Sequence, residues 1–345
     1  MGDDTAPEAV PVQGPSPWRR YLPLLILIFL APATGELLSG SSPPASWITI
    51  FGIINIVLYG FGAVLAREYS KLWGGGWHRV LLLGAAYGIV EEGLVCKSFF
   101  DTKWPDLGPL ATYGRYLGTG WVWSLNLTIF HMFISIAIPI LIVELMFPSV
   151  RAVNWTNRPG RITILLLFIA NAILTPVIFQ PYRAIPQLTI ATIVVLLLAL
   201  LAWRWKGPQL PTLPDVRLLR PITMGLLGFA CTFFFLIVQY VIPKTALPPI
   251  ADMALTAGVA FLVGRFLYFR TGAGRVWTDR HRVALVTGAL VPFMMLAPLV
   301  ELGNHPSNGK HYTGQSLVGL AFLIGLIFLR RAILRRQAPT EVQGT

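Results

Sequence analysis

The sequence predicts an all-α fold, a polytopic bundle of about ten transmembrane helices. Three observations lead to this prediction. Hydrophobic residues make up 55% of the 345 residues and charged residues only 12%, whereas about 25% of residues are charged in soluble proteins. Several apolar runs exceed the roughly 18 residues that are needed to cross a bilayer. The basic residues lie in short clusters between these runs.

The apolar runs define ten candidate spans, joined by short loops rich in Gly and Pro. The spans are Tyr21–Leu38, Trp47–Leu65, Val80–Phe99, Trp121–Met146, Ile162–Phe179, Leu188–Trp203, Ile222–Val241, Pro248–Tyr268, Ala284–Leu302 and Ser316–Leu329. No gap between them is large enough for a soluble domain. We therefore expect a disordered cytoplasmic tail over residues 1–18, a single transmembrane domain over 19–336 and a cytoplasmic tail over 337–345.

The distribution of basic residues predicts the orientation. With both termini in the cytoplasm, 21 of the 27 Lys and Arg residues fall in cytoplasmic segments, as the positive-inside rule requires. The eleven tryptophans lie in loops or near the ends of spans, where indole rings settle at the headgroup level. The charge of +12 is thus explained by topology, and we expect no nucleic-acid partner. The expected location is a cell membrane, in particular a bacterial cytoplasmic membrane, with the lipid bilayer as partner.

Two segments at the ends of spans allow more than one interpretation. Arg19 and Arg20 before the first apolar run resemble a secretory signal, but the run continues through Leu38 and predicts an uncleaved helix. The longest external loop, Asp101–Gly120, is either a lid or re-entrant segment or, as we expect, a solvated connector.

The third span carries two adjacent glutamates, Glu91 and Glu92, roughly 17 Å below its start. An ionisable group at this depth costs roughly 2.5–3.5 kcal/mol on insertion. Two ionised carboxylates so close would repel each other, so we expect a shared proton or a shared cation. Tyr87, one turn before Glu91, is placed to donate to that carboxylate.

The fourth span carries a polar stripe at helical spacing that includes His131, roughly 15 Å below the outer surface. His131, Glu91 and Glu92 thus reach a similar depth in a core about 30 Å thick. A buried histidine also serves simply as a hydrogen-bonding group between helices, and this interpretation is preferred for Asn171 in the fifth span. Other acidic residues lie nearer the ends of spans: we expect interfacial positions for Glu36, Asp252 and Glu301, and an arginine partner for Glu144.

The segment Tyr87-Gly88-Ile89-Val90-Glu91-Glu92, followed by Phe130-His131 in the next span, resembles the CAAX-protease and bacteriocin-processing (CPBP) superfamily of intramembrane proteases. The resemblance implies that Glu91, Glu92 and His131 form a catalytic centre that activates water. The likeness covers about a seventh of the chain. Cys96 stands where that family has an arginine, Leu127 stands where it has a phenylalanine, and no later His-x-x-x-Asn motif is present.

Three functions remain open from the sequence. The first is an intramembrane hydrolase acting on a membrane-embedded peptide or small molecule. The second is a proton- or cation-coupled transporter that uses the same acidic pair, and the third is a non-catalytic membrane scaffold or subunit. No phosphate-binding loop and no His-Glu-x-x-His motif is present. Cofactor, metal and oligomeric state therefore stay unassigned.

Overall fold

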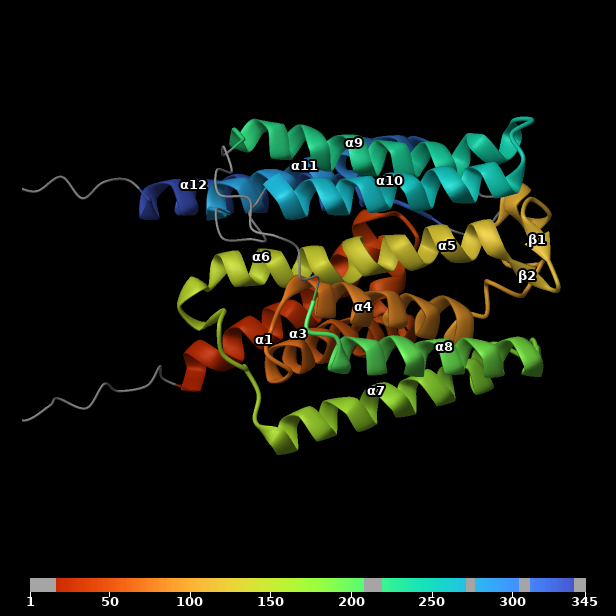
Figure 1. Ribbon diagram of the computed structural model, residues 1–345, viewed down its shortest axis with the longest axis horizontal. Helices are drawn as coiled ribbons and strands as arrows, with labels where there is room; N and C mark the ends of the chain where they lie inside the picture. The colour runs from red at the N-terminus through yellow and green to blue at the C-terminus, as the bar shows by residue number, and fades with distance from the viewer. Residues whose placement is uncertain (1–16, 208–218, 271–276, 304–310, 338–345) are drawn as a thin grey trace, which may run out of the picture.

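The computed structural model describes residues 17–207, 219–270, 277–303 and 311–337. Its helices run side by side along the long axis of the molecule (Figure 1). The terminal tails expected over 1–18 and 337–345 lie almost wholly outside the described residues.

The first four predicted spans are helices that contain a π-helical segment. They are α1 (Pro17–Pro32) with η1 (Ala33–Leu38); α2 (Ile50–Asn55), η3 (Ile56–Gly60) and α3 (Phe61–Leu72); α4 (Trp77–Gly88) with η4 (Ile89–Val95); and α5 (Trp121–Phe130), η6 (His131–Ala137) and α6 (Ile138–Met146).

The other six predicted spans are uninterrupted helices. They are α7 (Arg158–Phe179), α8 (Ile185–Arg204), α9 (Pro221–Tyr240), α10 (Pro249–Arg270), α11 (Asp279–Leu302) and α12 (Gln315–Arg336). The sixth and tenth spans are longer than predicted. Helix α8 begins three residues earlier, at Ile185, and includes Arg204. Helix α12 continues past the apolar run to Arg336, because arginine side chains can reach the headgroups while their backbone stays helical.

Nine helices of the described residues are long and apolar enough to cross a membrane. The predicted third span is not among them, because its helix carries Arg79, Glu91 and Glu92 within its 19 residues. This helix nevertheless packs inside the bundle, against α3, α5, η6 and α8. Its charged residues therefore belong to the interior of the bundle, and they do not mean that the predicted third span is missing.

The segment from Asp101 to Gly120 is folded against the end of the bundle. It contains a 3-10 turn, η5 (Gly108–Ala111), and a two-stranded antiparallel hairpin of β1 (Arg115–Tyr116) and β2 (Thr119–Gly120). Leu107 and Leu110 are each only 2% exposed, and the Tyr113 hydroxyl donates to the carbonyl of Leu247 at 3.0 Å. The expectation of a solvated connector is therefore wrong for this half of the loop, because its leucines add to a buried cluster. The remaining short turns are η2 (Pro44–Ile48), η7 (Pro148–Val150) and η8 (Ile242–Lys244).

The continuous helix from α5 through η6 to α6 is the centre of the molecule. Its side chains enter all three buried apolar clusters: one with α1, α3 and α4, one with α11 and α12, and one with the external loop. A helix with apolar side chains on several faces is suited to such a position, and its polar stripe then lies inside the protein. His131 lies on this central helix.

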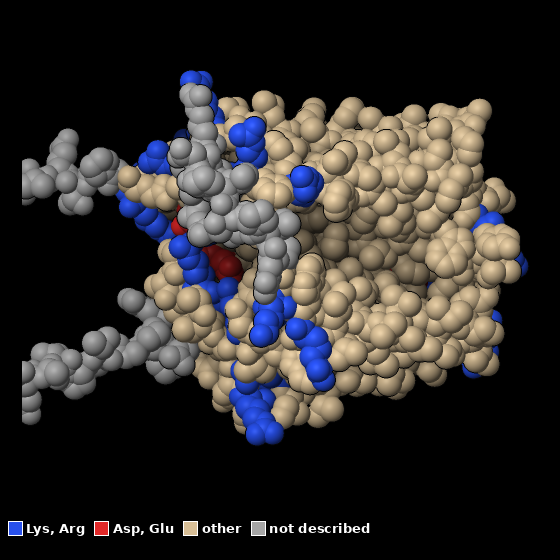
Figure 2. All heavy atoms as spheres, in the orientation of Figure 1, with Lys and Arg blue, Asp and Glu red and all other residues tan. Residues whose placement is uncertain are grey.

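The outer helices turn their apolar side chains away from the protein. Val177 on α7, Ile250 on α10 and Leu302 on α11 are 75%, 74% and 83% exposed, as expected of surfaces that meet lipid chains. Lys and Arg gather at the end of the bundle where α1 begins and α12 ends (Figures 1 and 2). That gathering agrees with the predicted clustering of basic residues, and the assignment of this end to the cytoplasm stays a prediction.

Candidate functional site

Four π-helical segments supply the polar side chains of one buried site. Among the described residues these are all the π segments present, and each contributes: η1 carries Glu36, η3 carries Tyr59, η4 carries Glu91 and Glu92, and η6 carries His131. Within a π segment the backbone bonds run five residues along the chain instead of four, as from Cys96 N–H to the Glu91 carbonyl at 2.8 Å. Such segments occur frequently at functional sites.

Prolines adjacent to two of these segments explain part of their geometry. Pro139 lacks the N–H that would bond the Ser135 carbonyl in an α-helix, and η6 ends two residues before it. Pro32 removes the donor for the Ile28 carbonyl in the same way, just before η1. The backbone of Gly60 packs against that carbonyl, since a Cβ at position 60 would lie 2.3 Å from Ile28 O. The freed backbone group thus faces a neighbouring helix rather than lipid.

The imidazole of His131 lies between the two adjacent glutamates. Its Nε2 is 2.9 Å from Glu91 Oε2 and 3.2 Å from Glu92 Oε1. Its Nδ1 is 3.0 Å from the hydroxyl of Ser135, one turn further along η6. Since Nε2 carries at most one hydrogen, it can donate to only one of the carboxylates at a time. The structure therefore brings together the three predicted site residues.

Both glutamates reach one histidine because of the π turn that holds them. In an α-helix, adjacent residues point about 100° apart, and the sequence pattern assigns Glu91 and Glu92 to neighbouring faces. A turn with more residues reduces that angle. The approach is also close, since a Cβ at Gly88 would lie 3.0 Å from His131 Cβ, and one at Gly84 would lie 3.1 Å from Met132 Cα. The small residues Gly84 and Gly88 thus allow this helix to pack closely against η6.

A tyrosine joins the glutamate pair to a third carboxylate. The hydroxyl of Tyr59 donates to Glu36 Oε1 and also lies 3.2 Å from Glu91 Oε1. Ser42 donates to the other oxygen of Glu36. The phenol expected at this position was that of Tyr87, and that prediction is wrong, because the Tyr87 hydroxyl is buried without a hydrogen-bond partner. The Tyr87 ring instead packs edge-on against Tyr59 and His131.

Ser98 and Trp123 hold the other side of the glutamate pair. The Ser98 hydroxyl donates to Glu92 Oε2 and accepts from the indole N–H of Trp123 at 2.9 Å. Trp123 belongs to the apolar cluster that the external loop completes. Glu92 is thus fixed from both ends, by His131 and by Ser98.

The site is closed to solvent. His131, Glu91 and Glu92 are 1%, 4% and 7% exposed, and Tyr59 and Ser98 have no exposed surface. The Glu36 end is partly open, where both Glu36 and Ser42 are half-buried, and Cys96 beside Glu91 is half-buried as well. Charges and dipoles in such an enclosure act on one another more strongly than they would in water.

The donor atoms of the site are of the kinds that bind a divalent metal ion. One ligand atom each of Glu91, Glu92 and Cys96 lie within 4.8 Å of one another, and His131 Nε2 lies beside both carboxylates. A set of carboxylate, imidazole and thiolate ligands is typical of zinc, so the residues fit a metal as well as a metal-free carboxylate–histidine site.

The comparison with known families gives one result. The model of a family described as an uncharacterized membrane protein family matches residues 25–337. The chain belongs to this family. The match covers all four π segments and every residue of the site. No curated protein and no solved structure matches the chain.

Other polar residues of this membrane protein lie outside the site. Asn171 donates to the Ile54 carbonyl at 2.9 Å, which confirms the helix-to-helix contact predicted for it. Glu144 pairs with Arg67 and also with Lys71, so the arginine partner predicted for it is confirmed. Glu301 accepts the backbone N–H groups of Gly314 and Ser316 and so stabilises the start of α12.

Two predicted interfacial residues are buried or belong to the site. Glu36 contacts Tyr59 within the site, and Asp252 has no exposed surface. The prediction for Glu36 is wrong because η1 turns its carboxylate inward toward the second span. Asp252 lies in the first turn of α10, near the end of the span as predicted, and it is buried because the external loop and α5 pack over this turn.

Tyr59, Ser98 and Trp123 are the site residues that sequence analysis missed. A tyrosine and a tryptophan in an apolar run read as interfacial or core residues, and a serine after a span reads as part of a loop. The usable signal was weak: Tyr59 lies about as deep in the second span as Glu91 in the third, and it precedes a glycine.

Proposed function

We propose that this membrane protein is an intramembrane hydrolase whose reactive centre is Glu91, Glu92 and His131. The single observation that carries the proposal is the position of His131 Nε2, within 3.2 Å of both carboxylates in a buried site. The resemblance to the CPBP superfamily, which rests on the same three residues, supports the same reaction. We place the protein in a cell membrane, with the bacterial cytoplasmic membrane as the expected one.

In this proposal one carboxylate acts as a general base toward a water molecule. It accepts a proton while the water oxygen forms a bond to the carbonyl carbon of the substrate. The C–N bond then breaks, and the proton passes to the leaving nitrogen. His131 holds the two carboxylates in place and donates from Nε2 to whichever of them is ionised. A bound divalent cation would polarise the carbonyl group and the water.

The departures from the CPBP pattern indicate where this chain would differ. Cys96 occupies the position of the arginine, and its thiol lies 3.4 Å from Glu91 Oε1. The sequence has no second histidine motif, and the polar group that contacts Glu91 on this side is Tyr59, which also donates to Glu36. The substrate class we propose is a membrane-embedded peptide, with a small membrane-soluble amide or ester as the alternative.

The test is cleavage of membrane-anchored peptide reporters by the full chain in vesicles. Glu92→Gln keeps the size of the side chain and removes the base, so we expect cleavage to fall by roughly 100-fold or more. Glu301→Gln is the matched control, because Glu301 only caps α12, and it should cleave normally. Equal cleavage by wild type and Glu92→Gln would refute the proposal.

Two further measurements belong to this experiment. A chelator together with metal analysis of the purified protein separates the metal-bound centre from the metal-free one. The thermal stability of Glu92→Gln distinguishes the hydrolase from the scaffold. If Glu92 is catalytic, the variant should fold normally and lose cleavage. If Glu92 only joins helices, the variant should be less stable or assemble wrongly, and the wild type should show no cleavage.

A specific observation also favours proton- or cation-coupled transport. The side chains of Ser42, Glu36, Tyr59, Glu91 and His131 form a continuous series of contacts from the half-buried end of the site to its centre. Because a phenol has one proton, Tyr59 can donate to only one of its two carboxylates at a time. A proton would move along the series when a protonated Glu36 gives its proton to the Tyr59 oxygen while Tyr59 gives its own proton to Glu91.

Proton flux into vesicles tests this second function. Wild-type protein should acidify or alkalinise the vesicle interior under an imposed gradient, and the Glu91→Gln, Glu92→Gln double variant should not. Flux that is the same in both proteins would exclude the acidic pair as a relay. Flux without reporter cleavage would favour the transporter over the hydrolase.

A further inference from the structure

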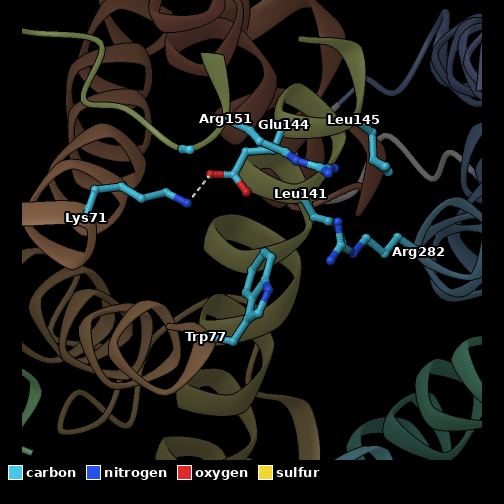
Figure 3. A pocket seen from close by; sticks show the side chains of 8 residues that line it. Lys71, Trp77, Leu141, Glu144, Leu145, Arg151 and Arg282 are labelled. Carbon is cyan, nitrogen blue, oxygen red and sulfur yellow. Dashed lines mark ion pairs between the residues drawn. The ribbon is translucent and has the colours of Figure 1, made fainter. Parts of the chain in front are cut away.

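A cavity lies at the end of the bundle where the basic residues gather. It has a volume of about 260 Å³ and is formed by α3, α4, α6, the turn after η7, and α11. Three cationic side chains, Lys71, Arg151 and Arg282, converge on it together with Glu144 and the indole of Trp77 (Figure 3). Glu144 and His131 are 13 residues apart on one helical span, so the cavity lies roughly 20 Å from the glutamate–histidine site.

The cations of the cavity are held in place by acidic partners. Arg151 and Arg282 both donate to the same oxygen of Asp279, at 2.8 and 3.1 Å. Lys71 contacts Glu144 at 3.0 Å, and the buried Arg67 approaches the same oxygen at 3.4 Å. Two guanidinium groups that share one acceptor oxygen are necessarily close together, so their remaining N–H groups form a prearranged pair of donors.

The neighbouring carboxylates do not fully neutralise the positive charge of these side chains. Arg67 and Glu68 form a fully buried pair, and Glu68 also accepts the backbone N–H groups of Trp155 and Thr156. The remaining carboxylates, Glu144 and Asp279, face three cations in the cavity wall. These cations stay partly open to the cavity, with side-chain exposures of 23% for Lys71, 39% for Arg151 and 21% for Arg282.

We propose that this cavity binds a phosphate ester, with the phosphate oxygens held by Arg151, Arg282 and Lys71. Guanidinium groups match phosphate oxygens in a two-point geometry, and a lysine adds a point charge. The volume is below the roughly 300–1,000 Å³ of sites for drug-sized ligands, which suits a headgroup-sized molecule. Leu141 and Leu145 in the wall provide apolar contacts for its carbon atoms.

Two sources can supply this chemistry. The first is the phosphodiester headgroup of an anionic lipid, since indole rings settle at headgroup level and basic residues attract anionic leaflets. The second is a soluble phosphate monoester that enters from the aqueous side. The experiment distinguishes them by using one ligand of each kind.

The binding experiment uses the full chain, purified in a neutral detergent and stripped of lipid. Affinities are measured for short-chain phosphatidylglycerol, for glycerol 3-phosphate, and for short-chain diacylglycerol, which lacks the phosphate. We expect binding of a phosphate ligand that weakens as salt rises, and no comparable binding of diacylglycerol. A lipid site prefers phosphatidylglycerol, whereas a site for a soluble ester binds glycerol 3-phosphate equally well.

Variants locate the binding in the cavity. Arg282→Gln and Arg151→Gln should each weaken binding roughly tenfold or more, because each removes a charge-assisted hydrogen bond. Arg280→Gln is the matched control: Arg280 lies on the same helix, is exposed and does not line the cavity. Its affinity should equal that of the wild type.

Two results would overturn the proposal. One is a wild-type protein that binds neither phosphate ligand, or binds diacylglycerol equally well. The other is wild-type affinity in both arginine variants. If one of the variants does not fold, the other and the salt dependence of wild-type binding still decide the question. Neither outcome bears on the hydrolase, since no residue of the glutamate–histidine site is changed.

Discussion

Two neighbouring tyrosines, Tyr59 and Tyr87, illustrate how the site depends on single atoms. Their rings pack together with centroids 5.4 Å apart, and they are 0% and 4% exposed. The hydroxyl of Tyr59 contacts two carboxylates, whereas that of Tyr87 has no partner. Similar packing thus accompanies very different polar roles.

This difference predicts opposite results for the same substitution. Tyr59→Phe removes the hydroxyl that donates to Glu36 and contacts Glu91, and it should destabilise the protein by about 1–3 kcal/mol, with slower reporter cleavage. Tyr87→Phe removes an unpaired hydroxyl and should be neutral or slightly stabilising. Thermal unfolding in detergent measures both. A Tyr59→Phe protein as stable and active as Tyr87→Phe would contradict the role given to Tyr59.

Depth along the spans was enough to predict the three central residues, Glu91, Glu92 and His131. Counting 1.5 Å per residue places all of them near the bilayer midplane, and the structure brings their side chains together. The same method failed for Tyr59 and Glu36, because their positions depend on π turns in two other helices. Nothing in a single sequence states where a helix changes from α to π geometry.

The π segments and the glycines beside them set how closely the helices approach. Gly60 ends η3, and its backbone lies against the Ile28 carbonyl, to which Pro32 has no N–H to donate. A methyl group at this position would have to displace the backbone of α1. Gly258 in α10, by contrast, has no neighbouring atom within 4 Å of an added Cβ.

The two glycines therefore predict different outcomes for the same change. Gly60→Ala should destabilise the protein by about 1–3 kcal/mol, because the helices must separate. Gly258→Ala should be neutral or stabilising by up to about 1 kcal/mol, since alanine lowers the entropy cost of a helix. Apparent melting temperatures in detergent compare them. An equally tolerated Gly60→Ala would mean that the close approach is unnecessary.

At the level of elements, hydrophobic runs predicted the helices well and their ends less well. All ten predicted spans are helical in the structure, because long apolar runs have few alternatives in a bilayer. The ends of α8, α11 and α12 differ because basic and polar residues continue the helix past the apolar run. The packed part of the external loop was not predicted, since its buried leucines stand among glycines and prolines that indicate turns.

The whole molecule has one basic end, and this end also holds the start of α1 and the end of α12 (Figures 1 and 2). The hairpin of β1 and β2 lies at the opposite end (Figure 1). An even number of spans accounts for this arrangement. The positive-inside rule assigns the basic end to the cytoplasm.

Labelling from one side of the membrane tests this orientation. Lys103→Cys is placed in the exposed part of the external loop, and Arg280→Cys at the basic end. A maleimide that does not cross membranes should label Lys103→Cys in intact cells and Arg280→Cys only after permeabilisation. Wild-type protein, with Cys96 and Cys231 inside spans, gives the background. The reverse labelling pattern would invert the topology.

The four π segments also have a mechanical consequence. Each one replaces the regular backbone ladder with longer-range bonds, and helices bend most readily at such points. All four segments surround the same site, so the points at which these four helices bend most readily lie at one level of the bundle. The polar site around His131 thus lies at the level where these four helices can bend most readily.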